Sequence, residues 1–343
     1  MKKVVVIGGG FTGSTVAKKL ENEFDVTLID NKEYFEFTPG ILRTIVHPTQ
    51  TRCIQVKHKD YLKNSNVIIG KADKIGDKFV SVNKKKIKYD YLVLAMGSSY
   101  VAPFKHPKLF AASRSKELAV YNRYLVDGKN ILIIGGGLVG VELAGEIGYY
   151  YCGKKITIVA SGEHLLDRMP LKAQEYAEKV LKEMGVEIIF NDKVVKQKNN
   201  VFITEKGKKM NGEVGFTCVG ISPNTSLLNK MNGILDERRF VYVDENLRVK
   251  GMNNVFAGGD ITNIREEKTG QNAEKHAQVI AKNIRRFEQR KELTSYKHKS
   301  SPIVISLGPR KGILIMGNFV LTGIIPAILK WIVEKKELLK KKI

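Results

Sequence analysis

The chain has 343 residues, of which 43% are hydrophobic and 27% charged, a composition typical of a folded protein with room for two domains. Its three widely spaced cysteines, Cys53, Cys152 and Cys218, argue against a disulfide framework and favour a reducing cytoplasm. No apolar stretch reaches the ~18 residues that span a bilayer. We also expect no signal peptide, because the apolar run 4–7 leads directly into glycines.

The net charge of +23 is unusual. Residues 284–343 alone contain fourteen Lys or Arg against four Asp or Glu. Such a field favours nucleic acid, anionic lipid headgroups or acidic proteins as partners. A lysine-rich surface produced by compositional bias explains the same count, so charge alone does not choose a partner.

Two segments of the chain repeat one local pattern of strand, glycine turn, helix and strand. The apolar β-branched run 4–7 predicts a strand buried on both faces of a parallel sheet. The first unit comprises residues 4–7, 14–20 and 26–29; the second comprises 131–134, 141–149 and 156–159. This repetition is the main organising feature of the sequence.

In the first turn, Gly8, Gly10 and Gly13 form G-x-G-x-x-G between strand and helix. The first glycine allows a tight turn, the second lets a pyrophosphate approach the backbone, and the third lets helix pack on strand. The free N–H groups of the helix N-terminus attract phosphate. Asp30 ends the second strand, where its carboxylate can accept hydrogen bonds from a ribose. The unit therefore predicts a dinucleotide site.

The second turn repeats the spacing with Gly135, Gly137 and Gly140. Its second strand ends in Ala160 instead of an acid. An acid at this position would bind the ribose of NADH and repel the 2′-phosphate of NADPH, and alanine does neither. The cofactor is therefore predicted as NAD(P)H, with Arg168, Lys154, Lys155 or Glu163 as candidate contacts to its ribose or phosphate.

Short strands surround the two units. Residues 67–97 and 187–220 each suggest a small antiparallel hairpin layer followed by a strand that returns to the core. Residues 254–260, "NVFAGGD", predict one more strand that ends in glycines and an aspartate. A helix over 271–289, a basic linker and a tail from residue 301 complete the chain.

Two dinucleotides in one chain most simply serve hydride transfer from a nicotinamide to a flavin. The chain resembles the pyridine nucleotide oxidoreductase superfamily over nearly its full length. "VLAMGS" (93–98) and "CVGISPN" (218–224) are similar to its interdomain links, and "VFAGGD" to its second FAD motif. The resemblance implies an α/β fold of two Rossmann-like domains, with the NAD(P)H domain inserted into the FAD domain, and small antiparallel layers.

The expected boundaries follow from this resemblance. The FAD domain comprises residues 1–110 and 250–300, the NAD(P)H domain 111–249, and a C-terminal segment with a membrane-facing amphipathic helix 301–343. The residues assigned to FAD are Gly8, Gly10, Gly13, Asp30, Arg43, Ala72, Gly97, Asp260 and Lys268. Those assigned to NAD(P)H are Gly135, Gly137, Gly140, Glu142, Ala160 and Gly220.

The closest likeness within the superfamily is to type II NADH dehydrogenases and apoptosis-inducing-factor-like quinone reductases. "GVELAGEI" (140–147) is similar to the helix opening whose glutamate, here Glu142, faces nicotinamide and flavin, and Glu146 is a weaker candidate. "KTGQNAEKHAQVIAKNI" (268–284) is similar to the helix beneath the flavin. Gln271 matches the first of two glutamines near the quinone, and Lys275 replaces the second. His276 is instead typical of the apoptosis-inducing-factor-like branch.

The cysteines weigh against thiol chemistry. Disulfide reductases need a close cysteine pair, and sulfide:quinone oxidoreductases need a redox cysteine in the last third of the chain. Neither is present, and no Cys/His spacing indicates a metal. We therefore expect an FAD-dependent NAD(P)H:quinone oxidoreductase. A soluble ferredoxin- or rubredoxin-type reductase, or a non-enzymatic NAD(H)-sensing flavoprotein that binds nucleic acid, are the alternatives.

The C-terminal tail also resembles that of the membrane-associated flavoproteins. Beyond Pro326, Lys330, Glu334, Glu337 and Lys341 recur at helical spacing and define a polar face. Ile324, Ile328, Trp331, Ile332 and Leu339 lie broadly opposite. Such a helix suits the surface of an anionic bilayer, or packs on its own domain or on a partner in a homodimer. We expect a cytoplasmic protein, peripheral on the inner face of the cell membrane.

Overall fold

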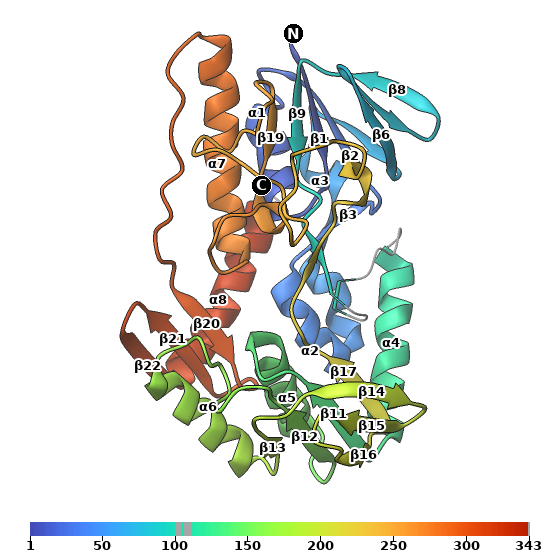
Figure 1. Cartoon of the computed structure of the whole chain (residues 1–343), viewed down its shortest axis with the longest axis vertical. Coiled ribbons are helices and arrows are strands. Elements are labelled where there is room, and N and C mark those ends of the chain that lie inside the picture. Colours follow the sequence, from blue (N-terminus) through green and yellow to red (C-terminus); the bar gives the residue numbers. More distant parts are fainter. Residues whose placement is uncertain (101–103, 106–110, 342–343) are drawn as a thin grey trace.

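The computed structural model describes residues 1–100, 104–105 and 111–341. Figure 1 shows two lobes, each built around its own parallel sheet. Two short strands, β10 (Ser98–Ser99) and β18 (Ser222–Pro223), pair in antiparallel fashion where the chain passes between the lobes. Residue 110, where we expected the first domain to end, lies outside the described residues.

The upper lobe in Figure 1 holds a five-stranded parallel sheet in the order β19-β9-β1-β2-β5. Its strands are β1 (Lys3–Ile7), β2 (Asp25–Asp30), β5 (Asn66–Ile69), β9 (Tyr91–Leu94) and β19 (Val255–Ala257). In the central strand, residues 4–7 are buried, which explains the unbroken apolar run. Helix α1 (Phe11–Leu20) packs against α7 (Gly270–Glu288), so that segments far apart in the chain lie side by side.

The lower lobe holds a four-stranded parallel sheet in the order β13-β12-β11-β17. Its strands are β11 (Asn130–Ile134), β12 (Lys155–Val159), β13 (Glu187–Ile189) and β17 (Val214–Thr217), and its helices are α4 (Ala111–Asp127), α5 (Leu138–Tyr150) and α6 (Leu171–Glu183). The predicted α/β fold with two Rossmann-like units is thereby confirmed, because β1-α1-β2 and β11-α5-β12 have the same parallel connection.

Small antiparallel sheets flank the parallel ones. They are β6 (Ala72–Gly76), β7 (Phe79–Val82) and β8 (Lys85–Lys88); β14 (Val194–Lys198), β15 (Val201–Thr204) and β16 (Lys209–Asn211); and β3 (Tyr34–Glu36) with β4 (Gln55–Lys57). One detail of the prediction is wrong. β5 and β13 were expected to be the first strands of the two hairpin layers. Instead, β5 joins one parallel sheet beside β2, and β13 joins the other beside β12, where their apolar residues cover the sheet edge.

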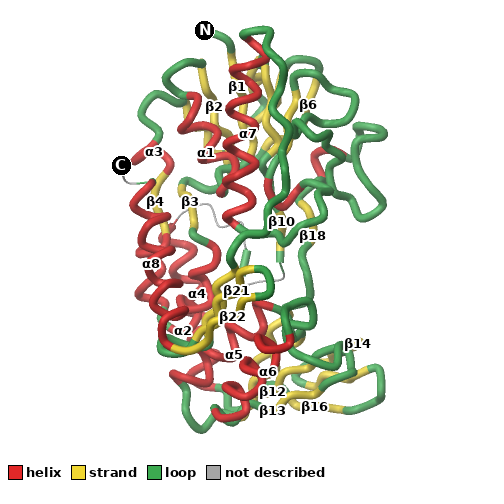
Figure 2. The backbone as a smooth tube through the Cα atoms, turned by 90° about the vertical axis from the view of Figure 1, so that its left-hand side faces the viewer, coloured by secondary structure: helices red, strands yellow, loops and turns green. Residues whose placement is uncertain are grey.

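Short helices connect these elements. They are α2 (Ile41–Val46), α3 (His58–Tyr61) and the 3₁₀ turns η1 (Thr38–Gly40), η2 (Pro48–Ile54), η3 (Ser226–Leu228) and η4 (Gly259–Ile261). After α7 the chain forms an antiparallel sheet of β20 (Ile303–Ser306), β21 (Gly312–Met316) and β22 (Phe319–Gly323). It ends in α8 (Ile324–Lys340), which Figure 2 shows running along one side of the molecule.

Helix α8 turns its polar face inward. Glu334 is 4% exposed and Lys341, just past the helix, 5% exposed, whereas Trp331 is 54% exposed. The exposed apolar side chains of the helix are Ile324, Ile325, Ile328, Trp331, Ile332 and Leu339. A surface helix ordinarily buries its apolar face, so this orientation is the reverse of the usual one. In the part of the chain that the structure describes, no helix is both long and apolar enough to cross a bilayer.

Candidate active site

A cavity of about 620 Å³ lies between the two lobes and reaches the C-terminal segment. It is bounded by the β1–α1 turn, the end of β2, η4, the N-terminus of α7, the start of α5, and side chains of β20 and α8. The predicted site residues that line it are Gly8, Gly10, Asp30, Ala72, Gly97, Glu142, Asp260, Lys268 and Gln271. The fold thus brings nine dispersed positions to one space.

The first glycine turn is shaped by close backbone contacts. Gly8 has φ +100°, and a Cβ there would lie 2.3 Å from the carbonyl oxygen of Ala95. A Cβ on Gly13 would lie 1.8 Å from the carbonyl oxygen of Gly8. A Cβ on Gly10 would meet none of the described residues within 4 Å. Gly10 also caps α1 without a side chain, so the first N–H groups of the helix are left for a ligand. This cradle fits a dinucleotide pyrophosphate.

Asp30 is 5% exposed and is held from two sides. Its Oδ2 accepts the backbone N–H of Gly9 at 3.0 Å and lies 3.0 Å from Nε2 of His58. The other ring nitrogen of His58 is 2.7 Å from the hydroxyl of Tyr61. Both partners fix the carboxylate at the cavity wall, where a ribose could be hydrogen-bonded. Sequence reasoning missed His58, because a histidine on a short helix 28 residues away carries no motif.

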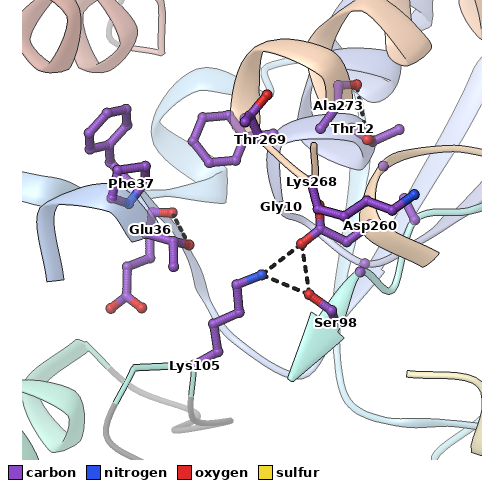
Figure 3. A pocket seen from close by; sticks show the side chains of 18 of the residues that line it. Gly10, Thr12, Glu36, Phe37, Ser98, Lys105, Asp260, Lys268, Thr269 and Ala273 are labelled. Atoms are coloured by element: carbon purple, nitrogen blue, oxygen red, sulfur yellow. Dashed lines mark hydrogen bonds and ion pairs between the residues drawn. The ribbon is translucent and has the colours of Figure 1, made fainter. Parts of the chain in front are cut away.

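Asp260, from the "VFAGGD" motif, also lines the cavity, and Figure 3 shows it beside Lys105 and Ser98. Its Oδ2 lies 2.7 Å from Nζ of Lys105 and accepts the hydroxyl of Ser98 at 2.7 Å. Burial raises the pKa of this carboxyl, but Lys105 and Ser98 outweigh burial and lower it. Asp260 is therefore an ionised acceptor suited to sugar hydroxyls. Lys105 was not predicted, since no motif marks it.

Lys268 also lines the cavity, but its ammonium group is directed to backbone carbonyls. Nζ donates to the oxygens of Thr262 at 2.8 Å and Ile264 at 2.9 Å. Burial lowers its pKa, against the opposing effect of Asp260. Lys268 consequently fixes the loop after Asp260.

His276 lies behind the cavity and braces the same motif. It is 1% exposed, and its Nδ1 accepts the N–H of Gly259 at 2.9 Å. Its Nε2 lies 3.0 Å from Oε1 of Glu266, whose Oε2 accepts hydrogen bonds from Tyr296 and His298. Burial raises the pKa of Glu266, but the neighbouring His276, Tyr296 and His298 lower it to about 2. The histidine therefore holds the turn that presents Asp260.

The second glycine turn repeats the first almost contact for contact. Gly135 has φ +114°, and a Cβ there would lie 2.7 Å from the carbonyl oxygen of Cys218. A Cβ on Gly140 would lie 2.0 Å from the carbonyl oxygen of Gly135, whereas one on Gly137 would meet none of the described residues within 4 Å. Gly137 caps α5 as Gly10 caps α1. A second phosphate cradle therefore lies at the N-terminus of α5, and Gly220 lies in the link that follows β17.

Ala160 occupies the place that Asp30 holds in the first unit. A Cβ on Gly136 would lie 2.8 Å from the Cβ of Ala160, just as one on Gly9 would meet Asp30. Among the candidate cations, Lys154 donates to the carbonyl oxygens of Val126 and Gly128. Lys155 begins β12, at the strand end opposite Ala160.

Arg168 remains as the candidate contact to a 2′-phosphate. Its side chain is 75% exposed and 3.2 Å from Glu267. Leu166, two residues earlier, donates its backbone N–H to the carbonyl of Gly136 at 2.8 Å, which anchors this segment to the second glycine turn. Glu163 is exposed.

The side chain of Glu142, in the first turns of α5, lines the cavity. Its Oε1 accepts the backbone N–H of Ser306 at 2.8 Å and lies 2.7 Å from Nζ of Lys330. Glu146, one turn on, accepts the hydroxyl of Ser306 at 3.3 Å. Burial raises the pKa of Glu146 to about 7, although Arg43 opposes the shift. Two acidic groups of α5, the helix that the second glycine turn opens, thus face the C-terminal segment.

The described lining of the cavity does not include Arg43 or Lys275. Arg43 pairs with Glu334 of α8 at 2.5 Å. Lys275 donates to the carbonyl of Lys299 and the hydroxyl of Ser301. The neighbour of Lys275, Glu274, lines the cavity together with Gln271, because residues three apart share a helix face.

Of the three cysteines, only Cys218 is buried, and burial raises its pKa to about 12. Cys53 and Cys152 are exposed. No cysteine belongs to the described cavity lining. The site therefore has no thiol within its described wall.

Comparison with known proteins identifies the family. Residues 2–279 match the family model described as "Pyridine nucleotide-disulphide oxidoreductase". The chain belongs to that family. Membership implies binding of FAD and NAD(P)H, and the two phosphate cradles fit such cofactors.

Among relatives, the apoptosis-inducing factor homolog B of Dictyostelium discoideum is 34% identical over 344 residues, covering 91% of this chain and 89% of that protein. The sulfide:quinone oxidoreductase of Aquifex aeolicus has a TM-score of 0.86 at 20% identity and covers 100% of this chain and 92% of that one. The NDH2 of Plasmodium falciparum in complex with NADH has a TM-score of 0.85 at 16% identity, covering 99% and 96%. The two solved structures show a common fold.

Proposed function

We propose that this pyridine nucleotide-disulphide oxidoreductase family member is an FAD-dependent NAD(P)H:quinone oxidoreductase that works at a membrane surface. One observation carries the proposal. The cavity that begins at Gly10 continues past Glu142 to β20 and α8. One space therefore connects the first phosphate cradle, the mouth of the second unit and a helix with an exposed apolar face.

The cofactors have distinct places in this proposal. The N-terminus of α1 and the carboxylates of Asp30 and Asp260 would hold FAD, and the N-terminus of α5 would hold NAD(P)H. When bound, the pair supplies hydride transfer from nicotinamide to flavin. We further propose the domain division stated above, with residues 111–249 as the NAD(P)H unit.

The roles of the chain's own residues follow from their contacts. Asp30 and Asp260 orient sugar hydroxyls, since both are already fixed by neighbouring groups. Glu142 is held by Ser306 and Lys330 at the mouth of the second unit, where it positions the nicotinamide end of the cofactor. Positioning of this kind can supply much of the rate enhancement of a bimolecular transfer.

The quinone as acceptor is supported by the C-terminal segment. Val304 of β20 and Val333 of α8 bring apolar surface into the cavity wall. The outer face of α8 exposes Ile328 and Trp331, with Lys335 over the Trp331 ring at 5.7 Å. An apolar stripe flanked by lysines suits the surface of an anionic bilayer, where quinones dissolve. One solved structure of similar fold is a sulfide:quinone oxidoreductase, whose name includes a quinone.

The net charge of +23 favours one rival, a reductase of acidic electron-carrier proteins. The test is steady-state oxidation of NADH and NADPH by the purified holoprotein with a short-chain quinone, with and without anionic vesicles. We expect quinone-dependent turnover that rises on vesicles carrying a long-chain quinone. Turnover with an acidic ferredoxin but none with quinones would favour the rival.

A further inference from the structure

Two glutamates of the cavity lining lie near each other, one on α7 and one on α8. Glu274 belongs to the second turn of α7, and Glu337 to the last turns of α8. Both side chains line the cavity, and both are about 15% exposed. Nζ of Lys340 lies 3.2 Å from Glu274 and 2.5 Å from Glu337, so one cation is shared between two acids.

The two carboxyl groups lie close to each other, because one ammonium group is within 3.2 Å of both. A hydrogen bond between them needs a proton on one of the two, because an ionised carboxylate has no hydrogen to donate. Oε2 of Glu337 is buried and has no hydrogen-bond partner within the described residues. A shared proton satisfies that oxygen and removes the repulsion between two close negative charges.

The two carboxyl groups differ in their affinity for a proton. Burial and the contact with Glu337 raise the pKa of Glu274. Burial also raises the pKa of Glu337, but Glu274 and Lys340 lower it on balance. Two acids this close titrate as a unit, so a proton bound here belongs to the pair rather than to either residue.

Other charged groups face the pair from neighbouring elements. Lys341 donates to the hydroxyls of Ser14 and Thr15 on α1, and burial lowers its pKa to about 8. Lys18 of α1 acts on Lys341 by charge repulsion. Further along α8, Glu334 is already neutralised by Arg43. The pair is thus set among cations, with the cavity on its open side.

We propose that Glu274 and Glu337 form the proton donor that completes reduction of the acceptor in this cavity. The inference rests on the proposed quinone reductase function. Reduction of a quinone to a hydroquinone takes two electrons and two protons, and a hydride from NAD(P)H carries two electrons and one proton. The carboxyl O–H bond of the pair breaks as the second hydroquinone O–H bond forms, and the pair then regains its proton from water.

The position of the pair agrees with this role. Gln271 lies three residues before Glu274 and lines the same cavity. Lys275, the position at which sequence resemblance placed a quinone contact, is bound to the chain near Ser301 instead. An acceptor oxygen on this face of α7 would therefore meet an amide at Gln271 and the acid pair beyond it.

The test compares the wild-type holoprotein with Glu274→Gln and Glu337→Gln. Each amide keeps the side-chain shape and still hydrogen-bonds the remaining carboxylate, but neither variant can hold the transferable proton. Glu292→Gln, on an exposed loop, is the matched control. The first readout is the infrared C=O stretch of protonated carboxyl groups at pH 7. We expect each variant to lose the same one-proton band and the control to keep it.

The second readout separates the two half-reactions by stopped flow. Bleaching of the flavin by NAD(P)H should stay within twofold of wild type in both variants, which also reports their folding. Reoxidation by quinone should slow at least tenfold and lose the decline toward high pH that the wild type shows. A band unchanged in both variants, or reoxidation that is unaffected in an active protein, would overturn the inference. Failure of the wild type itself to reduce any quinone would instead refute the proposed function.

Discussion

Lys330 on α8 and Glu142 on α5 form an ion pair, with 2.7 Å between Nζ and Oε1. The pair joins the C-terminal helix to the helix that the second glycine turn opens, at the wall of the cavity. Lys330 also donates to the carbonyl of Val304 on β20. Three segments distant in sequence are therefore held together by one ammonium group.

The first prediction concerns this ion pair. Lys330→Met should lower the free energy of unfolding by about 1–2 kcal/mol, because it leaves a mostly buried carboxylate without its cation. Glu142→Gln in the same chain should recover part of the loss. Urea unfolding of both single variants and the double variant measures the coupling. As the control, Lys336→Met, on the exposed part of the helix, should change the free energy of unfolding by no more than about 0.5 kcal/mol. Additive losses in the cycle would show that Lys330 and Glu142 do not interact.

The second prediction separates the two glycine cradles. Gly10→Ala and Gly137→Ala should both fold, because neither Cβ meets a described residue within 4 Å. The first should weaken FAD binding at least tenfold, or by about 1.4 kcal/mol, because the methyl group fills the phosphate space. The second should keep FAD and weaken NAD(P)H binding. Calorimetric titration of both cofactors measures these effects.

The control for that pair is Gly8→Ala, where a Cβ would lie 2.3 Å from the carbonyl of Ala95 and φ is +100°. This variant should lose stability or fail to fold rather than lose one ligand. If Gly137→Ala weakened FAD and NAD(P)H equally, the assignment of one cofactor to each turn would be incorrect.

The third prediction concerns Ala160. In Ala160→Asp, the new carboxylate can accept the N–H of Gly136, as Asp30 accepts that of Gly9. The acid should repel a 2′-phosphate and raise KM for NADPH about tenfold, while KM for NADH stays the same or falls. Arg168→Ala should raise KM for NADPH alone. Steady-state kinetics with both nucleotides measures this, and equal changes for both would contradict it.

Much of this arrangement was predictable from sequence, because the spacing of glycines and the acids that follow strands are local signals. The two turns, Asp30 and Asp260 could be placed in this way. The partners of these acids could not, since His58 and Lys105 reach them across the fold without any fixed spacing. The ion pair of Arg43 could not be predicted either, because its partner Glu334 is 291 residues away.

Helix α8 shows a different limit of sequence reasoning. Helical spacing predicted which residues share its polar face and which share its apolar face. It did not predict that the polar face is buried and the apolar face exposed. The polar face is buried because Arg43, Glu142, Ser14 and Thr15 offer it partners, and these partners come from three other helices. The three strands before α8 were not predicted, because their alternation is weak.

The fourth prediction concerns the exposed face of α8. Ile328→Ser with Trp331→Ser should weaken binding to anionic vesicles at least tenfold, since two side chains lose apolar contact with lipid. Activity with a short-chain quinone in solution should remain within twofold. Vesicle co-sedimentation measures the binding, and Val120→Ser on α4, also exposed, is the control. Unchanged binding in the double variant would remove the membrane role of this helix.

The fifth prediction concerns pH. The pKa of Glu146 is about 7 in the fold against an ordinary value of 4.5, so the folded state binds more protons than the unfolded chain between these limits. Stability should therefore fall as pH rises from about 4.5 to about 7, by roughly 3 kcal/mol from this group. Glu146→Gln should remove that decline, and urea unfolding at pH 5 and pH 8 measures it. Parallel curves for wild type and variant would contradict the assignment.

The central claim is that the chain holds a flavin and a nicotinamide cofactor so that a hydride passes between them. Anaerobic titration of the purified protein with NADH and NADPH, followed by visible absorbance, tests it directly. The account predicts a yellow protein with one FAD per chain that is bleached by one equivalent of at least one of the two nucleotides. A protein that takes up no FAD on reconstitution, or whose bound flavin neither nucleotide bleaches, would contradict it.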